Sequence, residues 1–283
     1  MKLLKTIDEM RAFRTATRQS GKRVGLVPTM GALHQGHSSL VRAAREKSDL
    51  VAVSIFVNPT QFGPNEDFAK YPRDLESDSR LLDREHVDVI FAPSVDDMYP
   101  AGAITWVTVE GMSDRLCGKS RPGHFRGVTT IVSKLFHIIE PDAAFFGQKD
   151  AAQVAIIRRM VSDLNMPVSI EVCPIIREPD GLALSSRNAY LNPAQRKSAL
   201  ALHRSLQRAQ KLLKNGERDS ATLIAAAKQE FANEPSVRLD YFEIVDPNSL
   251  ESVPSISKRA LIAVAAFVGN TRLIDNILVG PQP

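Results

Sequence analysis

Two histidines and two glycines stand close together in the segment VPTMGALHQGHSSL, residues 27–40. Gly31 and Gly36 have no Cβ, so a ligand can approach the backbone closely at both positions. We expect a helix to begin near Gly36 and His37, where unpaired backbone N–H groups and the helix dipole favour anions. The imidazoles of His34 and His37 can donate to phosphate oxygens and stabilise charge in a transition state. Taken alone, the pattern fits a phosphate site, an ordinary turn or a metal site.

Two carboxamide side chains, Asn58 and Gln61, lie in the segment FVNPTQF at residues 56–62. Pro59 makes the segment rigid, and each carboxamide offers both donors and an acceptor. This combination suits a small ligand that carries hydroxyl groups and a carboxylate. A plain turn with Asn before Pro is the alternative interpretation.

The segment Gly147–Asp150, GQKD, resembles the histidine segment in its position. A glycine again follows a predicted strand, and a lysine and an aspartate open a predicted helix. Lys149 would face a polyphosphate as a point charge. Asp150 can accept from a ribose hydroxyl or cap a helix, and both roles stay open. Gln153 follows three residues later on the same helix face, so it can point into the same crevice as Asp150.

A fourth polar cluster follows a glycine turn at residues 181–188, GLALSSRN. The hydroxyl groups of Ser185 and Ser186 and the guanidinium of Arg187 are suited to close over a phosphate chain. A capped turn before the next helix is the alternative.

Alternating strands and helices must position these clusters. Short apolar runs predict strands at 23–27, 50–57, 87–92, 142–146 and 168–172, and helical spacing predicts helices at 7–19, 38–47, 74–85, 128–139 and 150–164. This alternation predicts an α/β fold with a Rossmann-like, doubly wound parallel sheet. The first three clusters each follow a predicted strand, so we expect them to meet at one edge of the sheet.

The pattern changes after Cys173, where Glu178–Gly181 forms a strong turn signal. Helices at 194–214 and 220–232 and strands at 237–245, 260–268 and 273–279 then predict a second, smaller α+β C-terminal domain. We therefore expect two domains, residues 1–175 and residues 176–283.

Composition excludes several classes of protein. The chain has 283 residues, 43% of them hydrophobic, and a formal net charge of +4 that is spread without a dense basic stripe, which argues against a nucleic-acid partner. Cys117 and Cys173 form no CxxC pattern, so we expect free thiols rather than disulfides or a zinc site. The N-terminus has no sustained apolar stretch and soon carries the charged residues Asp8 and Glu9, so it makes a poor signal peptide. No apolar run reaches the ~18 residues that a membrane span requires. We expect a soluble cytoplasmic protein with no membrane partner.

Six ordered segments resemble the pantothenate synthetase family, also called pantoate–β-alanine ligase. They are PTMGALHQGH (28–37), FVNPTQF (56–62), YPR (71–73), RPGHFRGVTTIV (121–132), FGQKD (146–150) and EPDGLALSSRN (178–188). Residues 34–37 resemble the HxGH signature of the nucleotidyltransferase superfamily, and residues 184–187 resemble its mobile second signature. The C-terminal third matches mainly in length and continuity.

The resemblance implies an N-terminal domain that binds ATP and pantoate, a C-terminal domain that closes over them, and a homodimer. It also implies Mg2+ with ATP as cosubstrate. The pantoate carboxylate would attack the α-phosphorus of ATP, and the β-alanine amine would then attack the acyl adenylate.

The resemblance also assigns roles to residues. Catalysis would depend on His37, His34 and Lys149. ATP would contact Met30, Gly31, His34, Gly36, His37, Gly147, Lys149, Asp150, Ile176, Leu184, Ser185, Ser186 and Arg187. The substrates pantoate and β-alanine would be recognised with the help of Gln61 and Gln153, with Asn58 and Tyr71 as weaker candidates. The magnesium ligands are not assigned.

This sequence departs from the family pattern at two places. Leu184 stands where methionine is usual, and Gln148 and Ala152 replace an acidic residue and a glutamine, whereas Gln153 is retained. The RPGHF segment either lines the site or orders a loop. Two other functions are considered: a different adenylyltransferase of the HxGH superfamily, and a non-catalytic ATP-binding regulator.

Overall fold

The computed structural model describes residues 1–64 and 66–280, and contacts divide the chain into two compact units. Unit 1 comprises Met1–Ser113, Arg121–Gly147 and Ile156–Cys173, and unit 2 comprises Asp114–Ser120, Gln148–Ala155 and Pro174–Pro283. Each unit therefore contains segments that are far apart in the chain. The expected division into domains 1–175 and 176–283 stays a prediction.

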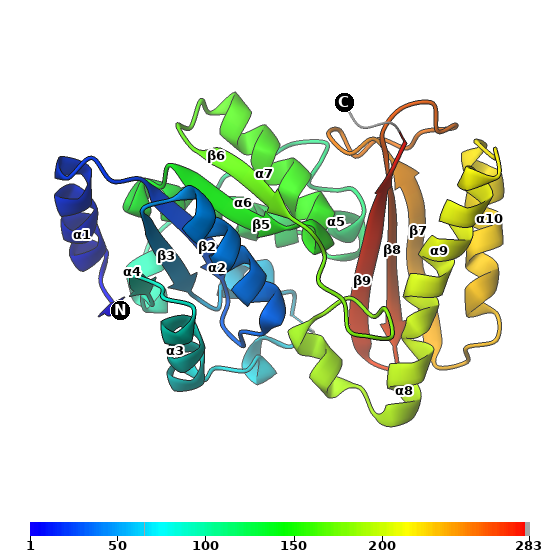
Figure 1. The fold of residues 1–283 in the computed structure, drawn as a ribbon, viewed down its shortest axis with the longest axis horizontal. Coiled ribbons are helices and arrows are strands. Elements are labelled where there is room, and N and C mark those ends of the chain that lie inside the picture. Colours follow the sequence, from blue (N-terminus) through cyan, green and yellow to red (C-terminus); the bar gives the residue numbers. More distant parts are fainter. Residues whose placement is uncertain (65, 281–283) are drawn as a thin grey trace. The chain divides into compact units, whose positions relative to one another are not determined.

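The described residues of unit 1 form a six-stranded parallel sheet in the order β1-β4-β3-β2-β5-β6. The strands are β1 (Lys2–Leu4), β2 (Val24–Thr29), β3 (Leu50–Ile55), β4 (Val89–Phe91), β5 (Ala143–Gly147) and β6 (Ser169–Cys173). Figure 1 shows the arrows of β2, β3, β5 and β6 running in one direction. The predicted α/β class is confirmed, and all the predicted strands exist. β1 was not predicted, because it is short and mostly exposed.

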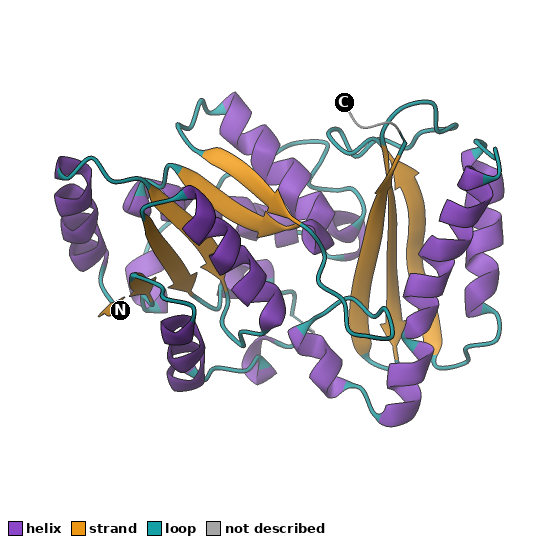
Figure 2. Ribbon diagram, viewed as in Figure 1, coloured by secondary structure: helices purple, strands orange, loops and turns teal. Residues whose placement is uncertain are grey.

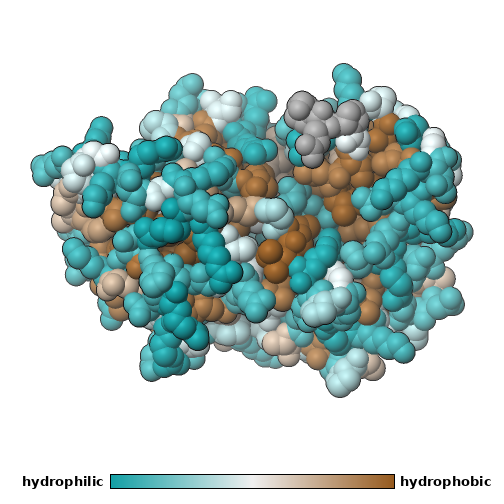
Figure 3. Space-filling view, viewed as in Figure 1, coloured by the Kyte–Doolittle hydropathy of each residue, from teal (hydrophilic) through white to brown (hydrophobic). Residues whose placement is uncertain are grey.

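Helices follow most strands of the sheet, as Figure 2 shows. They are α1 (Ile7–Gln19), α2 (Gln35–Lys47), α3 (Leu75–Arg84), α4 (Val95–Met98), α6 (His124–Ile139) and α7 (Ala151–Asp163), with 3-10 turns η1 (Pro59–Gln61), η2 (Phe68–Lys70) and η3 (Gln148–Asp150). The visible face of α2 carries mainly hydrophilic side chains (Figure 3), as expected for an amphipathic helix.

The core of unit 1 lies between the central strands and their helices. β2 and β3 read as apolar runs because both faces of a parallel sheet are covered. Val27, Val53 and Ile90 of the sheet pack with Val41 of α2 and Leu82 of α3, and all five are fully buried. This rigid centre fixes the points where β2, β3 and β5 end, which is where the polar clusters begin.

Unit 2 contains a three-stranded antiparallel sheet in the order β7-β8-β9. Its strands are β7 (Val237–Val245), β8 (Ala260–Val268) and β9 (Thr271–Val279), and its helices are α5 (Cys117–Ser120), α8 (Pro193–Ser198), α9 (Leu200–Lys214) and α10 (Ser220–Lys228), with η4 (Ser186–Tyr190) and η5 (Gln229–Phe231). Leu202 and Leu206 of α9 pack on Ile262 and Val264 of β8. The predicted smaller α+β part is confirmed.

Two of the predicted helices in unit 2 are wrong in detail. The helix expected over 194–214 is interrupted at the fully buried Ala199, where the Leu202 N–H donates to the Ala199 carbonyl at 3.2 Å. The helix expected over 220–232 ends at Lys228 and continues as η5. A tightened turn changes the hydrogen bonds from i+4 to i+3 and hardly alters the hydrophobic spacing, so the sequence pattern does not reveal it.

Both cysteines are free and buried, as expected. In the described part of the chain, no helix combines the length and the apolar character that crossing a bilayer requires.

Candidate functional site

The loop after β2 is fixed by a carboxylate that sequence reasoning did not identify. Asp78 of α3 accepts the backbone N–H groups of Ala32 at 3.0 Å and Leu33 at 2.8 Å. Gly31 has φ +81°, and a Cβ there would lie 2.8 Å from Asp78 Oδ2, so this position requires glycine. Burial raises the pKa of Asp78, and the two backbone bonds partly oppose that shift. The path of the loop therefore depends on one buried side chain of α3.

His34 and His37 together cap the first turn of α2. The Nδ1 atom of His34 accepts the Gly36 N–H at 3.1 Å, and the Nδ1 atom of His37 accepts the His34 N–H at 3.2 Å. Their ring centroids are 4.2 Å apart. Because both Nδ1 atoms are acceptors, each neutral ring carries its proton on Nε2. The two side chains thus present Nε2–H donors at a helix N-terminus, where anions are favoured.

The helix begins earlier than predicted. We expected it from Ser38, but α2 starts at Gln35 with His34 as its N-cap. Histidine is not among the residues preferred as N-caps, so the usual signal was missing. The earlier start places the whole HQGH segment in the first turn.

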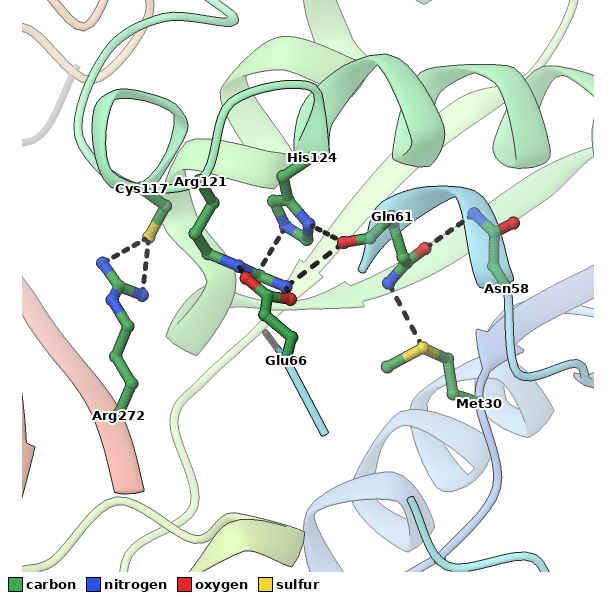
Figure 4. Close-up of polar contacts among 8 residues, drawn as sticks. All are labelled: Met30, Asn58, Gln61, Glu66, Cys117, Arg121, His124 and Arg272. Carbon is green, nitrogen blue, oxygen red and sulfur yellow. Dashed lines mark hydrogen bonds and ion pairs between the residues drawn. The ribbon is translucent and has the colours of Figure 1, made fainter. Parts of the chain in front are cut away.

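Gln61 is oriented by Asn58 and Met30, as Figure 4 shows. Asn58 Nδ2 donates to Gln61 Oε1 at 3.0 Å, and Gln61 Nε2 donates to Met30 Sδ at 3.2 Å. The Gln61 amide group is therefore directed as a donor, with its carbonyl oxygen already engaged. Met30, Asn58 and Gln61, three of the predicted site residues, lie in contact in unit 1.

Asn58 itself is 1% exposed and makes its polar contacts inside the protein. Its second donor bond goes to the Gly127 carbonyl at 3.1 Å, and Tyr99 Oη donates to its Oδ1 at 2.9 Å. Burial raises the pKa of Tyr99, which keeps the phenol neutral and able to donate. This arrangement fits a residue that orients Gln61.

The RPGHF segment holds the backbone of Gln61. Arg121 pairs with Glu66 through two bonds of 2.6 Å and also donates to the Gln61 carbonyl at 3.2 Å (Figure 4). His124 lies 3.0 Å from Arg121 Nη1 and 2.8 Å from the same Gln61 carbonyl. Because arginine only donates, His124 accepts at Nε2 and donates from Nδ1 to the carbonyl. Arg121 and His124 therefore order this loop, whereas a role in lining the site stays a prediction.

Gly127 allows α6 to approach the same turn. A Cβ at this position would lie 2.5 Å from the Thr60 carbonyl oxygen and 2.7 Å from the Gln61 backbone nitrogen. Backbone atoms cannot swing aside as a flexible side chain can. The contact therefore fixes the distance between α6 and η1.

Tyr71 and Gly147 are the remaining predicted site residues of unit 1. Tyr71 is 7% exposed, and its ring meets Phe62 edge-on at 5.9 Å. Gly147 is the last residue of β5, and a Cβ there would meet no atom within 4 Å. The packing of the protein does not require glycine at 147. A close approach by a ligand would require it.

Lys149 and Asp150 belong to unit 2. Asn276 of β9 holds the backbone at Gln148 and Lys149. Asn276 Nδ2 donates to the carbonyls of Gln148 at 3.0 Å and Lys149 at 2.9 Å, and Gln148 Nε2 donates back to Asn276 Oδ1 at 2.9 Å. Asn276 is 3% exposed. Lys149 Nζ is 3.9 Å from Asp150 Oδ2. Gln153 lies one turn later, in the first turn of α7.

The second candidate phosphate segment is a hairpin in unit 2. The Leu184 N–H donates to the Ile176 carbonyl at 2.9 Å, and Arg177 pairs with Ala183 in an antiparallel bridge. Ser185 Oγ accepts the Arg187 N–H at 3.3 Å and so caps η4, in which Ser186 is the first residue.

Ion pairs brace this hairpin. Glu178 accepts from Asn188 and from Arg196, each at 2.8 Å. Arg177 forms bonds of 2.6 and 2.9 Å to Asp275, which is 3% exposed. Asp275 and Asn276 are neighbours on β9, so one strand ties down both the hairpin and the Lys149 segment.

Sequence reasoning missed Asp275 and Asn276, although a signal was present. They are adjacent polar residues inside an otherwise apolar strand, LIDNILV. Buried polar side chains nearly always have hydrogen-bonding partners. An adjacent pair of them in an apolar strand therefore indicates a structural role.

Cys117 has a structural role in unit 2. Its Sγ is 3.2 Å from Tyr241 Oη. Figure 4 shows its contacts of 3.6 and 3.7 Å with the Arg272 guanidinium. Arg272 also pairs with Asp240 at 2.7 Å, and burial raises the pKa of Tyr241 well above its usual value. Among the described residues, no three His, Cys, Asp or Glu side chains gather as metal ligands would.

This chain resembles known proteins over nearly its whole length. A family model described as Pantoate-beta-alanine ligase matches residues 2–278. A relative named pantothenate synthetase from Koribacter versatilis (strain Ellin345) is 60% identical over 279 residues, which cover 99% of this chain and 96% of the relative. A pantothenate synthetase from Moorella thermoacetica (strain ATCC 39073 / JCM 9320) is 57% identical over 279 residues, which cover 99% of both chains.

Solved structures agree with the sequence relatives. Pantothenate synthetase from Thermus thermophilus superposes with a TM-score of 0.94 at 44% identity, covering 99% of this chain and 100% of the other. Pantoate-beta-alanine ligase from Francisella tularensis, complexed with Beta-gamma ATP and beta-alanine, gives a TM-score of 0.79 at 35% identity, covering 100% of both chains.

Proposed function

Because the chain belongs to the pantoate–β-alanine ligase family, we propose that it condenses (R)-pantoate with β-alanine to pantothenate, converting ATP to AMP and pyrophosphate. The observation that carries this proposal is the match over residues 2–278, which contains all the motif segments quoted above. The resemblance drawn from those motifs is thereby confirmed at the level of the family.

The first half-reaction activates a carboxylate. A pantoate carboxylate oxygen attacks the α-phosphorus of ATP, the bond from that phosphorus to the bridging oxygen breaks, and pyrophosphate leaves. This step requires positioning and charge stabilisation more than a protein nucleophile. His34 and His37 would donate from Nε2 to phosphate oxygens, and their direction is set by the Nδ1 bonds of the helix cap.

The other proposed contacts to ATP come from both units. Lys149, Ser185, Ser186 and Arg187 would neutralise the β- and γ-phosphates. The remaining expected contacts are Met30, Gly31, Gly36, Gly147, Asp150, Ile176 and Leu184, of which Gly147 and Asp150 would lie at the ribose and the Ile176 backbone at adenine. The open space around a Cβ at Gly147, with no atom within 4 Å, supports a close approach of ligand there.

Pantoate would be held by Gln61 and Gln153. The Gln61 carbonyl is engaged by Asn58, so its amide is suited to donate to a hydroxyl or carboxylate oxygen of the substrate. We assign Asn58 a positioning role because its polar contacts lie inside the protein. Tyr71 stays a weaker candidate for the same pocket.

In the second half-reaction, the β-alanine nitrogen attacks the acyl carbon of pantoyl adenylate. The nitrogen attacks as the neutral amine, after the ammonium has lost one proton to solvent. An amide bond forms, the acyl–oxygen bond to AMP breaks, and the nitrogen releases a second proton. We propose that Mg2+ enters with ATP, since magnesium in such sites is commonly held by substrate phosphates and water with one or two carboxylates.

We further propose a homodimer, a cytoplasmic location and a C-terminal domain, residues 176–283, that closes over ATP. Ile104 (86% exposed) and Trp106 (41% exposed) lie in an extended segment whose Val107 bonds to Thr129 and Thr130 of α6. Such exposed apolar residues support a self-association surface. Light scattering should find a dimer that Ile104→Glu weakens; an unchanged dimer would place the interface elsewhere.

ATP–pyrophosphate exchange, measured with and without pantoate, tests the activity. Exchange that requires pantoate, followed by AMP release on addition of β-alanine, is the expected result. Exchange only with another acceptor would support a different adenylyltransferase of the HxGH superfamily. ATP binding without any exchange would support a non-catalytic regulator. Gln153→Ala should weaken the use of pantoate far more than the binding of ATP.

A further inference from the structure

Unit 1 has a cavity at the edge of its sheet opposite to the motif segments. The cavity measures about 570 Å³ and is lined by residues that immediately precede three strands: 21–23 before β2, 141–142 before β5 and 166–168 before β6. The polar clusters follow the carboxyl ends of these parallel strands, whereas this cavity lies at their amino ends, where the arrows of Figure 1 begin. We call it the amino-edge cavity. It is separate from the proposed catalytic residues of unit 1.

The lining of the amino-edge cavity has an excess of positive charge. Four cationic side chains, from Arg14, Arg18, Lys22 and Arg23, accompany two carboxylates, from Glu140 and Asp142, which leaves two positive charges. Asp142 is already engaged, because its Oδ2 accepts the Val24 N–H at 2.7 Å. Arg18 and Glu140 form an exposed pair at 3.4 Å, which solvent screens strongly.

Arg14 is the unusual group in this lining. Its side chain is only 12% exposed, and its nearest carboxylate oxygen, on Asp142, is 3.7 Å from Nη2. The Nε and Nη1 atoms are buried and have no hydrogen-bond partner in the protein. Buried donors are nearly always paired, and a guanidinium is shaped to hold a phosphate or carboxylate through two parallel bonds. The guanidinium therefore has two donors that no protein group uses, and a shift of the side chain toward the cavity would let a bound anion accept from them.

Apart from Gly21 and His137, the rest of the lining is apolar. Phe136 at the end of α6 is joined by Pro141, Met166, Pro167 and Val168. A bare anion would leave this surface without a partner, whereas an organic ligand would cover it. The volume lies within the range of about 300–1,000 Å³ that small-molecule pockets occupy.

We propose that the amino-edge cavity binds a phosphate monoester with a compact apolar body. A phosphate monoester carries nearly two negative charges at neutral pH, which matches the charge excess of the lining. The phosphate lies against Arg14, with Arg18, Lys22 and Arg23 around it. The apolar body covers Phe136, Met166 and Val168.

Titration calorimetry of the full-length enzyme with phenyl phosphate tests this assignment. A saturating non-hydrolysable ATP analogue is present, so that the probe does not report on the proposed ATP site. Wild-type protein should bind phenyl phosphate with a millimolar or lower dissociation constant, at least tenfold tighter than phenol or inorganic phosphate. Absence of binding at concentrations tenfold above that range, or binding of phenol or inorganic phosphate as tightly as phenyl phosphate, overturns the proposal.

Variants that each remove one positive charge test whether phenyl phosphate binds in the amino-edge cavity. Arg14→Gln should weaken phenyl phosphate at least tenfold, and Arg18→Gln, at an exposed position, should weaken it less. Arg11→Gln removes the same charge from the same helix at an exposed position outside the lining, and should bind as wild type does. Equal loss in Arg11→Gln and Arg14→Gln, or no loss in Arg14→Gln and Arg18→Gln, contradicts the assignment. Arg18→Gln keeps the test decisive if Arg14→Gln unfolds.

Discussion

The two units hold their candidate phosphate segments in different ways. In unit 1 the HQGH segment is the first turn of a helix, and its loop is fixed by backbone N–H groups on Asp78. In unit 2 the Ser185–Arg187 segment is a short capped turn braced by side chains, chiefly Arg177 with Asp275 and Arg196 with Glu178. A segment held through its own backbone N–H groups changes its geometry only if that turn unfolds, whereas bonds between pairs of side chains can be released one at a time. We infer that the HQGH segment keeps one geometry and that the Ser185–Arg187 segment is the more adjustable of the two.

The largest expected effect comes from the imidazole of His37. His37→Ala should reduce pantoate-dependent ATP–pyrophosphate exchange by at least ~10², because one preorganised transition-state donor commonly contributes ~10²–10³ in rate. His37→Asn is the matched control, since its carbonyl oxygen can replace Nδ1 in the helix cap and only the Nε2 donor is lost. A fall in His37→Ala that His37→Asn restores would assign His37 to capping alone.

Gly127→Ala tests whether the main-chain contact in unit 1 is as rigid as its geometry indicates. The added methyl meets the Thr60 carbonyl at 2.5 Å, so η1 and Gln61 must move. We expect kcat/KM for pantoate to fall by ~10²-fold, the loss that a displacement of about 1 Å can cause, with a smaller change in the KM for ATP. Gly63→Ala, where a Cβ makes ordinary contacts of 3.7 Å or more, should behave as wild type does. Equal losses for both substrates would count against a role of this contact in pantoate binding.

Asn276→Ala probes the side-chain bracing of unit 2. It frees the carbonyls of Gln148 and Lys149 and the amide of Gln148, and the loss of these three side-chain hydrogen bonds should lower the free energy of unfolding by about 1–3 kcal/mol. We expect activity to fall about tenfold through misplacement of Lys149, which is less than the effect of His37→Ala. Denaturant unfolding and steady-state kinetics measure the two effects, with the exposed Asn233→Ala as control. Full activity in a destabilised Asn276→Ala protein would show that Lys149 does not need this brace.

The smallest expected effect is a loss of stability on removal of the Arg121–Glu66 ion pair. Its contribution to the free energy of unfolding depends on pH. Burial raises the pKa of Glu66, but the hydrogen bonds and charge of Arg121 outweigh it, and the net pKa is lowered. The ionised carboxylate therefore stabilises the fold above the usual glutamate pKa, and this contribution is lost as the pH falls through the lowered value. Glu66→Gln should lower the free energy of unfolding by about 1–3 kcal/mol at pH 7.

The difference between Glu66→Gln and wild type should then narrow below about pH 4.5. Glu76→Gln is the control, because Glu76 forms an exposed pair with Arg80 and should change stability by less than about 0.5 kcal/mol. A difference for Glu66→Gln that does not vary with pH would mean that the pair stabilises through packing alone.

The sequence predicted the strands and most helices because hydrophobic spacing reports burial, and burial dominates in a sheet covered by helices. Asp78 could not be predicted, because it lies among other acidic residues on an amphipathic helix and its partners are backbone groups 45 and 46 residues away. Gly127 was not recognised either, because the predicted helix began at residue 128, whereas α6 begins at His124 and contains Gly127. The capping role of His34 was missed because histidine is not a usual N-cap.

Asn276 also bears on the order in which this protein is made. Lys149 leaves the ribosome long before its partner, because 127 positions separate the two residues in the chain. Until β9 has been translated, the carbonyls of Gln148 and Lys149 lack their amide donor, and Arg177 lacks Asp275. A nascent chain can complete the parallel sheet early, but both candidate phosphate segments of unit 2 must wait for the last strand. A premature stop before β9 would therefore yield a chain with the histidine pair but without the bonds that hold the Lys149 backbone.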